Sequence, residues 1–91
     1  MNENLILADG TKLEEAHILK TNAVEIFLYI QTKNMTIRKV FDLMSDAAKT
    51  RKITAELMNG GKADYNGFTE LISVRKETSG QFTAILQKPE V

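Results

Sequence analysis

The stretch that decides the fold is Ala23-Val-Glu-Ile-Phe-Leu-Tyr-Ile-Gln31. In a strand, side chains alternate between two faces. One face of this stretch would carry Val24, Ile26, Leu28 and Ile30, and the other Ala23, Phe27 and Tyr29, with Glu25 as the exception. A strand that is apolar on both faces belongs inside a sheet. A helix is the competing interpretation for any short apolar run, but the length, β-branched residues and two aromatics favour a strand.

Composition places the chain among small folded domains. Its 91 residues are 43% hydrophobic and 26% charged, which predicts one domain over residues 1–91. The sequence has no cysteine, which excludes thiol catalysis and cysteine-based zinc sites and favours an intracellular setting. We also expect neither a signal peptide nor a membrane span, because no apolar run approaches the roughly 18 residues that a span requires.

Charge is balanced in total but not along the chain. The formal net charge is zero, which argues against a strongly basic nucleic-acid binder. Residues 1–32 hold two basic and five acidic side chains, whereas residues 33–52 hold six basic and two acidic ones. The sequence therefore has an acidic start and a basic middle.

The residues before the central stretch predict a hairpin. Residues 4–8 are an apolar strand, and Asp9-Gly10 is a pair that favours a tight turn. The return strand is expected from Thr11 to Leu19 or Lys20, with mixed polarity typical of an edge. A helix over residues 11–19 is the alternative. A turn at residues 20–22 would lead into the central strand.

An amphipathic helix is expected over about residues 36–49. Thr36 is a suitable N-cap. Four apolar residues then recur at helical spacing and predict the stripe that packs on the sheet: Ile37, Val40, Phe41 and Met44. Ser45 or Asp46 is expected to cap a second short turn, because these residues prefer caps to helix interiors. The helix should therefore be kinked or broken.

The remaining chain reads as strands and turns. Residues 53–57 alternate, Asn59-Gly60-Gly61 predicts a second hairpin, and Gly67 interrupts the next strand. Residues 68–75 and 81–87 alternate again, with Phe82, Ala84 and Leu86 expected to face inward. The predicted class is α+β, in the order β-β-β-α-β-β-β. The sheet would be antiparallel, or a small partly open barrel, packed by one helix.

Catalytic signals are weak throughout the sequence. His17 is the only histidine, and Glu14 and Glu15 would point to opposite faces of a strand. Metal sites usually need three or four ligands, and no serine is surrounded by a nucleophile motif. Gly60-Gly61-Lys62 lacks the spacing and the following helix of a phosphate-binding loop. We therefore expect no enzyme, no metal and no cofactor.

The best functional candidate is a basic segment on and after the predicted helix, formed by Arg38, Lys39, Lys49, Arg51 and Lys52. Such a cluster could contact phosphates, but its only aromatic neighbour, Phe41, belongs to the predicted core stripe. A solvated helix face is the simplest interpretation, and we do not expect nucleic-acid binding. We expect a protein partner, or a second copy whose acidic start meets this segment in a head-to-tail contact.

A set of motifs across most of the chain resembles small proteins encoded in prophages of Gram-positive bacteria, near tail and baseplate genes. The motifs are Asp9-Gly10-Thr11, Met35-Thr36, Val40-Phe41, Ser45-Asp46, Lys49-Thr50, Lys52-Ile53-Thr54 and residues 65–74. The resemblance implies a non-catalytic structural or accessory tail protein, located in the host cytoplasm or the virion. It supplies no site residues. An inhibitor of a host protein, acting as an anti-defence factor, is the alternative function.

The predicted helix stripe can be tested by truncating its largest member. If Phe41 packs on the sheet, Phe41→Ala should lower the free energy of unfolding by about 3–5 kcal/mol. Denaturant unfolding would measure that loss, and an unchanged stability would contradict the packing.

Overall fold

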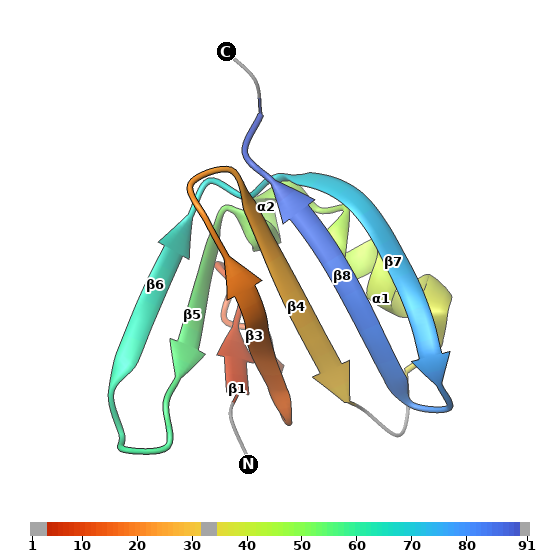
Figure 1. The fold of residues 1–91 in the computed structure, drawn as a ribbon, viewed down its shortest axis with the longest axis horizontal. Helices are drawn as coiled ribbons and strands as arrows, with labels where there is room; N and C mark the ends of the chain where they lie inside the picture. The colour runs from red at the N-terminus through yellow and green to blue at the C-terminus, as the bar shows by residue number, and fades with distance from the viewer. Residues whose placement is uncertain (1–3, 32–34, 90–91) are drawn as a thin grey trace.

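The computed structural model describes residues 4–31 and 35–89. It contains eight strands and two short helices in these ranges (Figure 1). The elements are β1 (Asn4–Ile6), β2 (Lys12–Leu13), β3 (Ala16–Thr21), β4 (Glu25–Gln31), α1 (Ile37–Met44), α2 (Ala47–Thr50), β5 (Lys52–Glu56), β6 (Lys62–Asn66), β7 (Glu70–Thr78) and β8 (Gln81–Gln87). The α+β class predicted from the sequence is confirmed.

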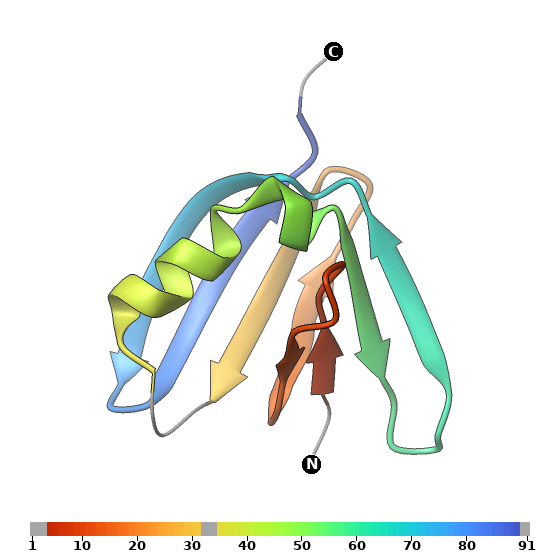
Figure 2. The ribbon, with the colours of Figure 1, turned by 180° about the vertical axis from the view of Figure 1, so that it is seen from behind.

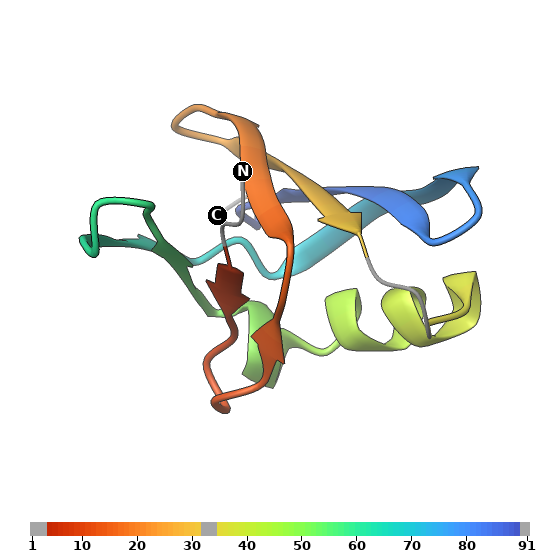
Figure 3. The ribbon, with the colours of Figure 1, turned by 90° about the horizontal axis from the view of Figure 1, so that it is seen from below.

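The strands divide into two antiparallel four-stranded sheets. One has the order β2-β1-β5-β6 and the other β3-β4-β8-β7. Figure 3 shows the second sheet as one layer, with α1 beneath it and the first sheet to one side. The predicted order β-β-β-α-β-β-β is therefore wrong, since four strands precede the helices and four follow them. The predicted barrel is not confirmed, because the strands of the two sheets do not pair in the described residues.

The central stretch forms β4, an internal strand of its sheet as predicted, between β3 and β8. The predicted placement of Val24 on the same face as Ile26 is wrong: Val24 precedes the strand and is 55% exposed. The core face of β4 carries Ile26, Leu28 and Ile30, each at most 1% exposed. The opposite face carries Phe27 and Tyr29, which are half-buried. No described element lies over this outer face, which points toward the viewer in Figure 1 and away from α1 in Figure 3.

The predicted return strand is two strands that belong to different sheets. Asp9-Gly10 makes the expected turn between β1 and β2, where the Thr11 N–H donates to the Asp9 carboxylate at 3.0 Å. The chain then changes sheet at Glu14–Glu15, and Glu15 has φ +55°. This left-handed residue breaks the alternation that a single strand would require. The helix alternative for residues 11–19 is wrong.

The helix is broken where the sequence predicts. Thr36 caps α1 by accepting from the Lys39 N–H at 3.2 Å, and Asp46 caps α2 by accepting from the Ala48 N–H at 3.0 Å. The residues between the two helices are therefore cap residues that end one helix and begin the next.

The predicted helix stripe is only half right. Val40 and Met44 are fully buried, but Ile37 is 44% exposed and Phe41 is 51% exposed. At about 100° per residue, Phe41 lies on one flank of Val40 and Leu43 on the other. Leu43 is the flank that packs partly against the core. The expected 3–5 kcal/mol loss for Phe41→Ala is therefore not supported by this packing.

In the C-terminal hairpin, β8 agrees with its predicted alternation, whereas the alternation predicted for residues 68–75 is interrupted at Ile72. β8 is paired on both sides, and Phe82, Ala84 and Leu86 are buried as predicted. β7 is the edge strand beside it, with irregular register at Ile72 and again near Glu77. Gly67, at φ +89°, turns the chain from β6 toward β7. A side chain would be strained in that conformation, which explains the glycine.

One hydrophobic core joins both sheets and α1. It includes buried residues from every strand except β6 and β7. These two strands contribute half-buried side chains that pack against the core. Figure 2 shows α1 lying across β7 and β8 on the core side of the second sheet. The helix therefore covers the sheet near its free edge and leaves the edge itself open.

Two substitutions on neighbouring helix positions should separate core from surface. Met44→Ala removes a fully buried side chain and should lower the free energy of unfolding by about 2–5 kcal/mol. Phe41→Ala should cost about 1 kcal/mol or less, because half of that side chain is already in water. Urea unfolding at low protein concentration would measure both, and equal losses would contradict the observed rotation of α1.

Candidate interaction surfaces

The structure divides the predicted basic segment. Arg38 and Lys39 lie on α1, Lys49 on α2, Arg51 just after α2, and Lys52 at the start of β5. Two of these residues form ion pairs within the chain. Lys49 pairs with two carboxylates, and the Lys52 Nζ lies 3.9 Å from a carboxylate oxygen of Asp64. Two of the five predicted basic residues are therefore engaged within the chain.

Lys49 is the centre of an ion-pair cluster that connects distant parts of the chain. Its Nζ lies 3.3 Å from a carboxylate oxygen of Asp9 and 3.3 Å from one of Asp46. The Ala8 N–H also donates to the Lys49 carbonyl at 2.8 Å. The β1–β2 turn is thus fastened to α2. The acidic start and the basic middle, expected to attract neighbouring copies, meet here within one chain.

Hydrogen bonding stabilises the charged forms in this cluster. The backbone N–H of Thr11, followed by its hydroxyl and Lys49, lowers the pKa of Asp9 from 3.8 to about 2. The hydrogen bonds to Asp9 and Asp46 raise the pKa of Lys49. A carboxylate that accepts backbone hydrogen bonds holds its charge to lower pH.

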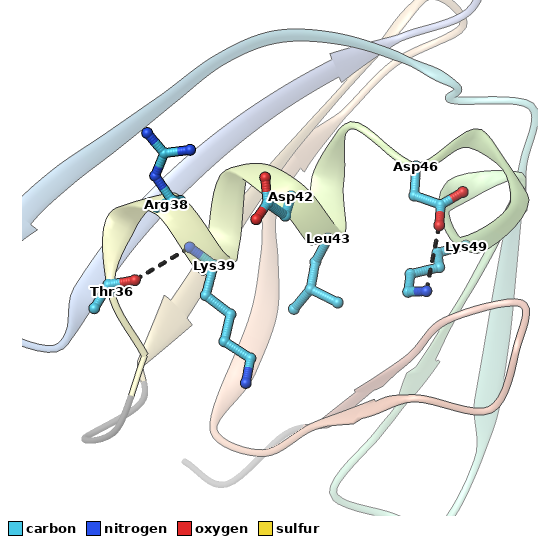
Figure 4. A pocket seen from close by; sticks show the side chains of 7 residues that line it. All are labelled: Thr36, Arg38, Lys39, Asp42, Leu43, Asp46 and Lys49. Atoms are coloured by element: carbon cyan, nitrogen blue, oxygen red, sulfur yellow. Dashed lines mark hydrogen bonds and ion pairs between the residues drawn. The ribbon is translucent and has the colours of Figure 1, made fainter.

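An open hollow of about 470 Å³ lies between α1 and this cluster (Figure 4). It is lined by Thr36, Arg38, Lys39, Asp42, Leu43, Asp46 and Lys49. Arg38 points away from Lys39 in Figure 4, and Lys49 is turned toward Asp46. Three of the five predicted basic residues thus share one hollow without converging on a point within it.

His17 lies on the outer face of the second sheet. Its ring centroid is 5.0 Å from that of Tyr29, with the ring planes tilted by 38°, and the residue is half-buried on β3. Within residues 4–31 and 35–89, no three His, Asp or Glu side chains are grouped so that they could hold a metal ion. Neither helix in these ranges is long and apolar enough to cross a membrane.

Sequence reasoning missed an apolar groove between α1 and β7, named here the edge groove. It is about 380 Å³ and is lined by Ile37, Arg38, Phe41, Asp42 and Val74. Phe41 and Ile37 are about half exposed, and Val74 is half-buried below them. The sequence analysis assigned Ile37 and Phe41 to the core, so it did not predict this groove. Helical spacing alone does not say which flank of an apolar stripe faces the core.

The edge groove opens beside a free strand edge. β7 pairs only with β8, so its other side has no strand partner among the described residues. Ile72, at the irregular position in the middle of β7, is 50% exposed. An open strand edge beside exposed apolar side chains is a surface on which another chain can add a strand.

The hydrogen bonds from Thr11 to Asp9, together with the smaller effect of Lys49, give a pH-dependent contribution to stability. Because folding lowers the pKa of Asp9, its contribution is complete above about pH 4 and is lost as the pH falls toward 2. The difference in Tm between the wild type and Asp9→Ala should therefore be largest near neutral pH and shrink at acidic pH. Thermal unfolding followed by circular dichroism would measure it.

Asp9→Asn is the matched control for this titration. An asparagine oxygen can still accept from the Thr11 N–H, but it cannot form an ion pair with Lys49. A Tm difference between Asp9→Ala and the wild type that stays constant from neutral pH to pH 2 would contradict the assigned pKa.

No protein-family model matches this chain, and neither a curated protein nor a solved structure matches it significantly.

Proposed function

We propose that this protein is non-catalytic and acts through protein–protein contacts, as a structural or accessory component of a phage or prophage tail. The observation that carries the proposal is the edge groove, where Phe41 and Ile37 stand about half exposed beside the open side of β7. Burying a phenylalanine side chain removes a large apolar area from water. An exposed one beside a groove is typical of a binding site.

The chemistry of the edge groove favours an extended protein segment as the occupant. Its floor is the half-buried Val74, its apolar wall is Ile37 and Phe41, and its rim carries one cation and one anion, Arg38 and Asp42. A strand added to β7 would satisfy backbone groups along the edge and place alternate side chains against this wall. Among the described residues that line the groove, Asp42 is the only one whose side chain could act as a general acid or base.

The placement of His17 also supports a non-catalytic role. Its ring packs against Tyr29 on the opposite side of the second sheet from the edge groove. A general base must lie within hydrogen-bond reach of the proton that it removes. His17 cannot serve a ligand bound in the edge groove.

The tail assignment rests on the resemblance described above and on the shape of the contact surface. Tail assemblies are built from repeated contacts among protein subunits, which a small domain with a free strand edge can supply. The alternative, an inhibitor of a host protein, would use the same edge groove, since strand addition is also a common way of binding an unrelated partner. The two roles differ in the identity of the partner.

Site-specific photo-cross-linking tests the edge groove as the contact surface. A photoreactive phenylalanine derivative at position 41 should cross-link to a protein in cells that carry the phage. The matched control is the same residue at position 58, because Met58 is 66% exposed but lies in the β5–β6 turn. Mass spectrometry would identify the adducts.

The identity of the adduct decides between the two roles. A component of purified particles supports the tail role, and a host protein supports the inhibitor. Cross-linking at position 41 no stronger than at position 58 would contradict the proposal that the edge groove binds protein.

A further inference from the structure

Charge is distributed unevenly along the edge that flanks the groove. α1 runs antiparallel to β7, as Figure 2 shows, so the start of the helix lies near the end of the strand. On β7, Arg75 therefore lies toward the start of α1 and Glu70 toward its end, and on α1 the groove-lining Arg38 and Asp42 follow the same order from basic to acidic. Glu77 partly offsets the basic end, since its carboxylate lies 3.9 Å from Arg75.

We propose that the occupant of the edge groove is a second copy of this chain, related by a two-fold axis that pairs β7 with β7 in antiparallel direction. A surface that is basic at one end and acidic at the other complements itself only when one copy is reversed. A parallel arrangement would place Glu70 against Glu70. This inference rests on the proposed protein-binding function of the edge groove and names its partner.

Side-chain direction selects the register of this pairing. Leu71 and Val74 pair with the buried Leu86 and Ala84 of β8, so both face the core side of the sheet. Glu70 and Arg75 pair with Gln87 and Thr83, so both face the outer side. Residues opposite each other in a sheet must point to the same face.

A two-fold axis between Ile72 and Ser73 meets this requirement. It places Glu70 opposite Arg75 of the partner subunit on the outer face, and Leu71 opposite Val74 of the partner subunit on the core face. Each pair occurs twice because of the symmetry. The exposed Ile72 lies at the centre of the contact, so apolar residues occupy the middle and charges the ends, as is usual for an interface.

The same pairing covers the exposed wall of the edge groove. The partner's strand would extend the floor of the groove beyond Val74 and place the partner's Leu71 beneath the overhanging Phe41. Leu71 and Val74 are only half-buried in the single chain. Dimerisation would therefore complete the burial of side chains at this end of the core.

The other free edges offer less. β2 has only two residues, and β3 exposes Leu19 but carries no acidic residue to complement its Lys20. β6 is also a free edge, but its residues Lys62, Asp64 and Asn66 are exposed and polar, and α1 lies on the other sheet. The head-to-tail contact expected from the sequence would use Asp9 and Lys49, which are already paired within one chain. Among the described residues, β7 is the edge that combines an open strand, apolar side chains and complementary charge.

Sedimentation velocity over a range of protein concentrations tests the dimer directly. The wild type should shift from 10.2 kDa toward twice that mass as concentration rises. Glu70→Arg and Arg75→Glu should each raise the dissociation constant about tenfold or more, because each places two pairs of like charges in opposition. Both positions are exposed, so the folded state should tolerate either change, and Tm would verify this.

Combining the two substitutions shows whether residues 70 and 75 pair directly or whether each change only destabilises the protein. An equimolar mixture of the two single variants should form a heterodimer, since arginine at position 70 of one chain then meets glutamate at position 75 of the other. The double variant Glu70→Arg/Arg75→Glu should dimerise with an affinity near that of the wild type. Failure of both the mixture and the double variant to dimerise, with a dimeric wild type, would overturn this register.

The experiments distinguish a failure of the proposed dimer from a failure of the proposed protein-binding function. A wild type that stays monomeric at every concentration would overturn the symmetric dimer. If position 41 nevertheless cross-links to a different protein, the edge groove still binds protein and only its occupant is wrong. If the wild type is monomeric and position 41 cross-links no more than position 58, both proposals fall.

Discussion

The pairing of β4 with β8 is the interaction on which the rest of the structure depends. Seven consecutive residue pairs join these strands, and on the core face Ile26, Leu28 and Ile30 lie opposite Leu86, Ala84 and Phe82. All six side chains are at most 1% exposed. Because this pair occupies the middle of the sheet, β3 and β7 must be its two edges. The open edge at β7 is therefore a consequence of how the core is paired.

Most of this pairing could be predicted from the sequence because it depends on local patterns. Alternation identified β4 and β8, Asp9-Gly10 and Asn59-Gly60-Gly61 identified two hairpins, and Thr36 and Asp46 identified the helix caps. Each of these signals uses only a few neighbouring residues.

The failures came from features that alternation does not encode. Glu15 in a left-handed conformation sends β2 and β3 into different sheets, and nothing in the pattern of residues 11–20 marks that change. The rotation of α1 is similar. Leu43 is apolar too and lies on the other side of Val40, and tertiary packing placed Leu43 rather than Phe41 on the core flank. The edge groove therefore could not be found from the sequence.

The Asp9–Lys49–Asp46 cluster changes how the basic segment should be understood. The segment is positive when counted along the chain, yet folding brings carboxylates from both β1–β2 and α1–α2 to Lys49. Arg38 and Lys39 share a hollow with this cluster, and Arg38 also lines the edge groove. The basic segment therefore contributes one lysine to an ion-pair cluster within the chain and one arginine to the edge groove.

The rotation of α1 links stability and binding in a single geometric choice. A helix turned by one position toward β7 would bury Phe41 and close the edge groove, but it would withdraw Leu43 from the other flank of the core. As folded, the helix keeps Val40 and Met44 in the core and leaves Ile37 and Phe41 over the free strand. Part of the Ile37 and Phe41 side chains therefore stays in water, although a chain this short has little apolar surface to bury. A second chain at β7 recovers that burial without any change in the fold, which is why the exposed flank of α1 and the open edge of β7 are best understood as one surface.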